Sequence, residues 1–509
     1  MNSAAEQSES QKHCHCKWKA CTKWGIIVVL GIIALLVILI ASRFLRDDPV
    51  VYEDSRDHFK YGSIGSETSS GLPYWIWKIL PEMFPEKFPG KGGYASFGFL
   101  YEDGKELPIG VSRRVSQGID RVWLNCSVCH SGTVRDTPAT QRQIYLGMPA
   151  NNFKLYEFIQ FLRSVPLDNR FTPDNVMDKI ESMGGKLDWL DRIIYRCIVV
   201  DQVRSTLFGL RHQLEFLNRQ HTWGPGRVDT FNPYKAIQFN FPMDKLPQEE
   251  LIGPTDYPSI WNQGPRQGMN LHWDGNNPSV EERNKSAALG AGVTPVTIDL
   301  KAIGRIEEWI WDLKSPPYPK PVNAKMVASG QKVYQEYCSG CHGMHEGSKY
   351  SFDTTKFPYL GQVDPITHVR TDTGRLNAYT EVLSVNQNTL YAGYDWRFKG
   401  FHKTNGYANM PLDGIWLRSP YLHNGSVPTL RDLLNPSNQR PKAFYRGYDV
   451  FDWDKVGFVS NVAEEKGKPF FKYDTEDEGN SNWGHEGKDY GTELSDAEKD
   501  AIVEYMKTF

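Results

Sequence analysis

The longest apolar stretch of the chain is residues 24–41, WGIIVVLGIIALLVILIA, which carries no charged side chain. A run of this length is just sufficient for a tilted membrane span. Positive charge is concentrated before it, at Lys12, Lys17, Lys19 and Lys23, whereas only Arg43 and Arg46 follow closely. That asymmetry predicts a cytoplasmic tail at 1–23, a transmembrane anchor at 24–41 and the remainder outside. A cleaved signal peptide is the alternative, although no clear A-x-A site follows the run.

Further along, apolar residues recur at helical spacing. This periodicity predicts helices within 151–165, over a longer reach at 175–220, at about 299–313, and at 326–342. The chain ends with LSDAEKDAIVEYMKTF, where Ser495 and Glu498 form a capping box before an apolar helix face. Sustained strand alternation is scarce, so the fold is expected to be mainly α.

Two segments are dense in Pro, Gly and aromatic or Asn residues instead. Residues 74–110 and 223–280 are therefore expected to form ordered loops and short turns, not regular helix. The proline-rich stretch KSPPYPKPVN at 314–323 is the best domain boundary. We accordingly expect two domains behind the anchor, at 42–320 and 321–509.

Charge and cysteine usage narrow the class of protein. The net charge of −3 over 509 residues leaves no basic excess to neutralise phosphates, so no nucleic-acid partner is expected. Cys14, Cys16 and Cys21 lie in the N-terminal tail, which is expected to be unstructured. Cys197 lies in the apolar context IIYRCIVV and is expected to be a buried, inert thiol, with no disulfide framework.

The remaining cysteines form one motif twice. Residues 126–130 read CSVCH, and residues 338–342 read CSGCH. Two thiols separated by two residues and followed by His are the attachment signature of c-type haem, in which the His is the proximal iron ligand. A zinc knuckle would need four ligands in two pairs, and a redox pair has no use for the His. The sequence predicts two covalently bound c-type haems, held by Cys126, Cys129, His130, Cys338, Cys341 and His342.

Each haem is defined by what occupies the sixth position of its iron. For the second haem the downstream candidates are Met410, His423 and His485, and spacing alone does not choose among them. For the first haem, Met148 could ligate or could roof the pocket. An open or water-bound first site lined by apolar residues is favoured.

Several segments resemble a known family. GIWLRSPYLHNGSVPTLRDLL, YPSIWNQ, LHWDGNN and the paired haem motifs look like the bacterial di-heme cytochrome c peroxidase superfamily. The closer match is its branch of rubber oxygenases and di-heme fatty-acid dioxygenases, over roughly residues 60–509. The resemblance implies two cytochrome c-like haem domains, a dioxygen-binding first haem and a bis-His second haem. It also implies a Trp between the rings, which here is Trp273.

The chain also departs from the peroxidase pattern at two positions, and these differences change the expected ligands and chemistry. The peroxidases place a Met ligand where this chain has Ser437, so Met ligation in the peroxidase manner is excluded. The rubber-oxygenase branch uses a late His, and His485 is so placed, which leaves His423 as a pocket residue near the second haem and as the second choice of ligand. Where the peroxidases carry an acid–base Glu, this chain reads ALGAGVTP, without a carboxylate, which weakens the peroxidase interpretation.

The expected protein is a membrane-anchored di-heme oxidoreductase, oxygenase-like. Its first haem would bind dioxygen and oxidise a small apolar substrate, and its second would transfer electrons, in exchange with a redox protein. Attachment of c-type haem outside the bacterial inner membrane agrees with a single-pass protein whose haem domains lie in the periplasm. The alternatives are an electron-transfer cytochrome without a substrate of its own, and a di-heme peroxidase.

Overall fold

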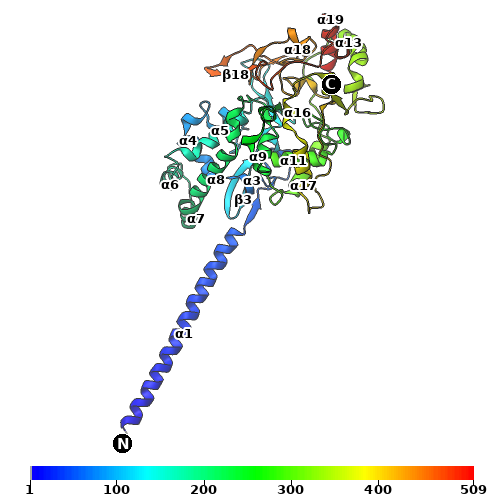
Figure 1. Cartoon of the computed structure of the whole chain (residues 1–509). Helices are drawn as coiled ribbons and strands as arrows, with labels where there is room; N and C mark the ends of the chain where they lie inside the picture. The colour runs from blue at the N-terminus through cyan, green and yellow to red at the C-terminus, as the bar shows by residue number, and fades with distance from the viewer. Residues whose placement is uncertain (1–2) are drawn as a thin grey trace.

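A single long helix, α1 (Ser3–Phe44), projects away from the rest of the molecule (Figure 1). The computed structural model describes residues 3–509, with side chains from residue 23 onward, so the side chains of Cys14, Cys16 and Cys21 lie outside the described part. The segment Lys23–Phe44, 22 residues long, is apolar and long enough to cross a membrane, and it is entirely exposed. Both a membrane anchor and a signal sequence fit such a helix.

The C-terminal end of α1 is fixed to the body by several contacts. Arg43 forms ion pairs with Asp188, at 3.6 Å, and with Asp191. Immediately afterwards β1 (Asp47–Pro49) pairs with β3 (Val111–Ser116) in antiparallel register. The direction in which α1 leaves the body is therefore set by both charge pairing and backbone hydrogen bonds.

Strands β1 and β3 belong to a four-stranded sheet of order β1-β3-β4-β2, with β4 at Ile119–Leu124 and β2 at Leu72–Pro73. The other strands form two-stranded pairs: β5 (Ser131–Val134) with β6 (Gln143–Leu146), β7 (Arg227–Asp229) with β8 (Pro254–Asp256), β9 (Met344–Glu346) with β10 (Lys349–Ser351), β11 (Val363–Pro365) with β12 (Gly406–Ala408), β13 (Ala443–Arg446) with β18 (Phe471–Asp474), β14 (Phe451–Asp452) with β15 (Gly457–Phe458), and β16 (Glu464–Glu465) with β17 (Lys468–Pro469). The fold is thus mixed, 43% helical and 14% strand, which corrects the mainly α expectation. Strands this short leave no visible alternation in the sequence.

Helix α4 (Tyr74–Met83) corrects the expectation of loop and turns after residue 74. It buries Trp77 and Leu80 on one face, although Pro81 lies inside it. Proline removes a backbone donor, which would leave the Trp77 carbonyl unpaired. The hydroxyl of Tyr94 donates to that carbonyl at 2.9 Å, so a tertiary contact replaces the hydrogen bond that Pro81 cannot make.

Helices α5 (Leu155–Ser164), α6 (Pro173–Ser182), α7 (Trp189–Ile194) and α8 (Val200–Gln213) pack beside the sheet, as the helical spacing predicts. A π-helical segment, Tyr195–Val199, joins α7 to α8. It turns Tyr195 and Val199 inward and leaves Cys197 exposed. The expectation of a buried Cys197 is therefore wrong, because the extra residue of a π turn rotates the helix faces.

In the C-terminal half, α13 (Ala324–Tyr337) crosses the last helix, α19 (Asp496–Met506). A Cβ atom at Gly330 would collide with the Ala501 carbonyl, so the crossing needs a glycine there. The capping box of Ser495 and Glu498 is confirmed. The remaining helices are α2 (Ser55–Tyr61), α3 (Ser66–Ser70), α9 (Asn232–Gln238), α10 (Gln248–Leu251), α11 (Val280–Gly290), α12 (Leu300–Trp311), α14 (Ser339–His342), α15 (Ile366–Val369), α16 (Gly374–Ala378), α17 (Glu381–Leu390) and α18 (Leu430–Leu433).

The buried core does not separate at residue 320. One apolar cluster joins Met148 and Trp261 to Trp416 and Phe451. Another joins Phe59 and Phe231 to Tyr379. The division into 42–320 and 321–509 stays a prediction, and the two parts share buried side chains across it.

Candidate haem-binding sites

The first Cys-x-x-Cys-His motif follows directly from the central sheet. Strand β4 ends at Leu124, and Asn125 caps the 3-10 turn Cys126–Val128 by accepting from the backbone N–H of Ser127 at 3.0 Å. Asn125 also donates to the carbonyl of Gly62, again at 3.0 Å, which ties the turn to the N-terminal segment. The position of the motif is thus determined by a buried polar residue immediately before it.

His130 is oriented by a backbone group. Its Nδ1 lies 3.0 Å from the carbonyl oxygen of Pro258, which can only accept, so Nδ1 carries the hydrogen and Nε2 is free. Burial lowers the pKa of His130 to about 3, so the imidazole is neutral. A neutral imidazole whose second nitrogen is held by a carbonyl is the usual arrangement of a metal-ligating His.

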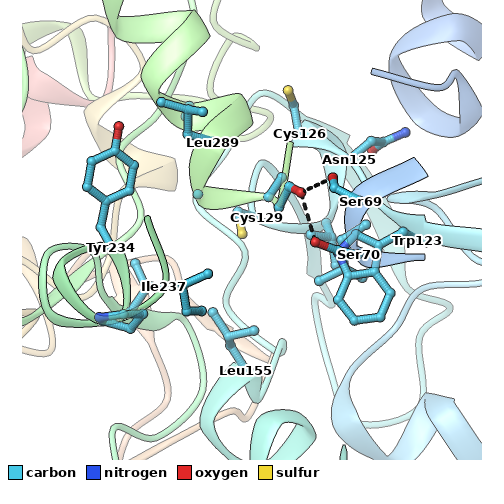
Figure 2. Close-up of a pocket in the computed structure, with 18 of the residues that line it drawn as sticks. Ser69, Ser70, Trp123, Asn125, Cys126, Cys129, Leu155, Tyr234, Ile237 and Leu289 are labelled. Carbon is cyan, nitrogen blue, oxygen red and sulfur yellow. Dashed lines mark hydrogen bonds between the residues drawn. The ribbon is translucent and has the colours of Figure 1, made fainter. Parts of the chain in front are cut away.

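Cys126, Cys129 and His130 line a cavity of about 880 Å³. Figure 2 shows the two cysteines on its wall, with Leu289, Tyr234 and Ile237 on one side and Ser70 and Trp123 on the other. Ligand cavities usually measure about 300–1,000 Å³ and are mostly apolar, so this one is large. It can accommodate a flat, apolar porphyrin and leave room for a second molecule.

Arg283, from α11, also lines this cavity. Its side chain is buried, with 8% of the residue exposed, and none of the ion pairs among the described residues involves it. Burial and the neighbouring Arg266 lower the pKa of its guanidinium to about 10. A buried cation without a carboxylate partner fits the propionate groups that a haem would bring.

The thiols do not fit the alternatives to haem. Burial raises the pKa of Cys126 and Cys341 to about 11 and that of Cys129 and Cys338 to about 12. With no metal bound, the four thiols are therefore neutral near neutral pH. In the part of the chain whose side chains are described, moreover, no group of three or more His, Cys, Asp or Glu could hold a metal ion. Covalent attachment of a haem fits these residues better than a zinc knuckle.

The second motif is delivered by α13 and α14, and its His is held in the same way as His130. His342 Nδ1 lies 2.8 Å from the carbonyl oxygen of Met410. His485 faces it, with ring centroids 6.2 Å apart and ring planes inclined by 42°. An iron bonded to both imidazoles at about 2 Å would require a centroid separation of about 6 Å. The buried Nδ1 of His485 has no hydrogen-bond partner, so this ring, unlike those of His130 and His342, is not oriented by a carbonyl.

The loop that carries His485 is fixed from outside. His485 has a φ of 47°, in the left-handed region, and its N–H donates to the Val369 carbonyl at 2.8 Å. Buried Arg440 donates to the carbonyls of Gly484 and His485, at 2.9 and 3.2 Å. Ser437, which stands where the peroxidases have their Met ligand, donates to Glu486 in the same loop.

The other candidate ligands lie elsewhere. The backbone carbonyl of Met410 accepts a hydrogen bond from Nδ1 of His342, so Met410 is held on the side of that imidazole away from His342 Nε2. His423 Nε2 is hydrogen bonded to the Tyr407 hydroxyl at 3.0 Å, and the two rings stack at 4.1 Å. Met148 is fully buried in the cluster around Trp261 and Trp416 and is not among the residues lining the cavity. At that position Met148 neither ligates the first iron nor forms the roof of the cavity.

Trp273 lies between the two motifs. It lines the first cavity, and its Nε1 donates to the Asp256 carbonyl at 2.8 Å. On its other side it packs against the small cluster of Val369 and Tyr407. Val369 in turn accepts from the backbone of His485, so packed groups connect the cavity with the second site.

The turn that holds Trp273 has a counterpart in the second half of the chain. Leu271 bridges to Asn277, and Tyr421 bridges to Val427. The following residues, His272 and Leu422, have φ of 65° and 66°. In both turns a glycine at positive φ, a Pro and an N-capping Ser or Thr then lead into a helix, in the same register. The register places His423 at the position equivalent to Trp273.

Polar residues of the cavity that the sequence did not point to include His272, Arg283 and Glu307. Glu307 comes from α12, one of its carboxylate oxygens is buried without a partner, and burial raises its pKa to about 7. The signal was present in the sequence, because Glu307 follows Ile303 by one helical turn and so lies beside the apolar face of 299–313. The segment ALGAGVTP (288–295), which stands where the peroxidases carry their Glu, contributes only uncharged lining.

Comparison with known proteins points to the same chemistry. Residues 406–445 match the family described as RoxA-like, cytochrome c-like. Two uncharacterised proteins of Sinorhizobium fredii are similar: y4iM is 30% identical over 50% of this chain, and y4iJ is 25% identical over 81% of it. The matches cover 64% of y4iM, just under two thirds of its length, and 83% of y4iJ. Residues 406–445 therefore belong to a cytochrome c-like domain of the RoxA-like kind, which implies a c-type haem.

Proposed function

We propose that this chain is a membrane-anchored di-heme c-type cytochrome oxidoreductase. A first haem, on Cys126, Cys129 and His130, would bind dioxygen for the oxidation of an apolar substrate. A second haem, on Cys338, Cys341, His342 and His485, would transfer electrons to or from a redox protein. The proposed location is the bacterial inner membrane, with the body in the periplasm.

The observation that carries the proposal is the asymmetry between the two proximal histidines. His342 is faced by His485 across 6.2 Å. Among the described residues no aromatic or imidazole ring is paired with His130, which instead borders the 880 Å³ cavity. A filled sixth position suits electron transfer, whereas an open one suits binding of a diatomic molecule.

The protein's own residues would supply orientation and exclusion of water. The Pro258 carbonyl fixes the tautomer of His130, and Arg283 offers a cation for a propionate. A haem bound there would supply an iron able to bind dioxygen. The apolar wall, which includes Phe158, Leu162 and Ile306, favours an apolar substrate and keeps water from it.

Carbon monoxide binding to the reduced, full-length holoprotein tests this assignment. We expect one haem of the two to shift its Soret band and the other to keep a low-spin spectrum. Two unreactive haems would favour an electron-transfer cytochrome without a substrate of its own. If both haems bound carbon monoxide, the assignment of His485 as a ligand of the second iron would be wrong.

A di-heme peroxidase is the second candidate, and Glu307 is the observation that favours it. A carboxyl group whose pKa is about 7 can exchange a proton near neutral pH, as peroxide cleavage requires. Glu307→Gln should reduce peroxide turnover by about 10²-fold if this is the function. Under the oxygenase proposal the same variant should leave dioxygen consumption within a few-fold of the parent protein.

A further inference from the structure

The cavity that begins at His130 reaches the protein surface at the base of α1. Phe44, the last residue of α1, lines it and is 41% exposed. Ile198 on the segment between α7 and α8 lines it as well and is 55% exposed. The exposed lining residues are all uncharged: Phe44, Ser69, Gln117, Ile198, Gln202, Thr206, Gln213, Ile237, Ala287 and Gly290. The charged lining residues, such as Arg283 and Glu307, lie deeper.

The level of this opening relative to a membrane follows from α1. The segment Lys23–Phe44 has 22 residues and is therefore about 33 Å long, close to the roughly 30 Å of a hydrocarbon core. If it spans the bilayer, Phe44 lies where the chain leaves the hydrocarbon. Because Arg43 is paired with Asp188 and Asp191, the start of α7 is held at that same level.

The surface beside the opening has the composition of a membrane-contacting face. Trp189 is 71% exposed and Ile193 is 51% exposed, and both lie on α7, on the side of the body from which α1 projects (Figure 1). Arg192, and Arg196 just after the helix, are exposed as well, and each is paired with a carboxylate, Glu181 and Asp174 respectively. Exposed aromatic and aliphatic side chains mixed with basic ones are typical of elements that rest in the lipid headgroup region.

We propose that the cavity is loaded laterally from the bilayer, with the hydrocarbon chain of a membrane lipid entering between Phe44 and Ile198. This inference rests on the proposed membrane anchoring and names the source of the apolar substrate. A chain that enters this way never crosses water, and the uncharged amides of Gln117 and Gln202 can hydrogen bond a neutral headgroup at the opening. The apolar surface of α1 and the wall of the cavity become one continuous hydrocarbon-compatible path.

The test uses the full-length holoprotein in phosphatidylcholine nanodiscs that contain a phosphatidylcholine with a photoreactive diazirine at the end of one acyl chain. After irradiation, labelled peptides are mapped by mass spectrometry. We expect adducts on the cavity wall, at residues 155–162 and 287–294. Label confined to α1 and the surface of α7 would overturn the proposal and favour a substrate taken from the aqueous phase.

A matched pair of variants makes the result specific. Ile198→Arg places a charge at the opening and should lower cavity labelling at least about tenfold, since a charged side chain is costly in hydrocarbon. Ile193→Arg alters a similarly exposed Ile that does not line the cavity, and it should leave cavity labelling unchanged. Equal labelling in the two variants would contradict the proposal.

Carbon monoxide spectra of the same nanodiscs separate this inference from the proposed function. An open first haem without label in the cavity refutes lateral loading alone. Label in the cavity without a reactive haem refutes the oxygen-binding assignment alone.

Discussion

Backbone carbonyls help to hold the imidazoles of His342 and His485 facing one another, one through the ring of His342 and the other through the main chain of His485. The Met410 carbonyl takes the Nδ1 hydrogen of His342, and the Val369 carbonyl holds the backbone of His485. Burial and the nearby His342 lower the pKa of His485 to about 3, so it is neutral and able to bind a metal. Under the proposed function, the difference between a closed and an open iron would depend on one residue, His485, of a glycine-rich loop.

His485→Ala should convert the second haem from low-spin to high-spin, because it removes the ring opposite His342. Electron paramagnetic resonance of the oxidised holoprotein measures the change. Met410→Leu should leave the spectrum alone, since Met410 acts through its backbone carbonyl. If His423→Ala produced the conversion and His485→Ala did not, His423 would be the ligand.

Glu307 should make stability fall as pH rises. Its pKa is about 7 in the folded protein against an ordinary 4.5, so between these values the unfolded chain releases the proton first. Folding is therefore favoured below about pH 4.5 and progressively less so up to about pH 7. Glu307→Gln should raise the melting temperature of the holoprotein at pH 8 more than at pH 5. Glu308→Gln, at the neighbouring exposed position, is the control, and an identical response from both variants would contradict this prediction.

Among the elements, α13 leads into the second motif and packs against α19. The packing of Tyr334 against Tyr505 and Phe509, with ring centroids 5.3 and 5.1 Å apart, joins the two ends of this half of the chain. Since α13 ends at the residue before Cys338, any displacement of the crossing moves the attachment site. The crossing of α13 and α19 therefore contributes to packing and also sets the position of the second attachment site.

Gly330→Ala should destabilise the protein by about 1–3 kcal/mol, because the added methyl group collides with the Ala501 carbonyl. Thermal unfolding monitored by circular dichroism measures this loss. Gly304→Ala in α12 is the matched control, since a Cβ there meets nothing within 4 Å, and helix propensity should favour it by up to about 1 kcal/mol. A Gly330→Ala variant as stable as the Gly304→Ala variant would show that the helices can separate freely.

Much of the element structure could be predicted from periodicity, including α5, α12, α13 and the capped α19. What could not be predicted depends on contacts between distant residues. In α4, the carbonyl that Pro81 leaves free is satisfied by Tyr94, which is distant in the sequence. Cys197 is exposed because a π turn rotates its helix. The two motifs were visible as sequence, whereas the cation at Arg283 and the carboxyl at Glu307 become part of the site only through folding.

For the molecule as a whole, the packed groups from the first cavity through Trp273 and Val369 to His485 connect the cavity with the loop of the second site. Trp273 is only half-buried, so its contribution to the core is smaller than that of Trp261 or Trp416. Its position favours a role in coupling the sites over a role in holding the fold.

Trp273→Leu should preserve both haem spectra and roughly preserve the melting temperature, while slowing electron equilibration between the haems. Flash photolysis of the carbon monoxide complex of the partly reduced protein measures that rate. Loss of a fully buried Trp typically costs about 3–5 kcal/mol when the replacement is small. A large loss of stability with unaltered transfer would therefore assign Trp273 to packing alone.

The matching turns at Leu271–Asn277 and Tyr421–Val427 have a consequence for how this molecule could have arisen. A shared register, with Trp273 and His423 in equivalent places, is what a duplicated ancestral unit would leave behind. Once two copies existed, one could keep an enclosed iron while the other lost its sixth ligand and gained a chamber. Division of labour between the halves would then require only a few local substitutions on one inherited scaffold.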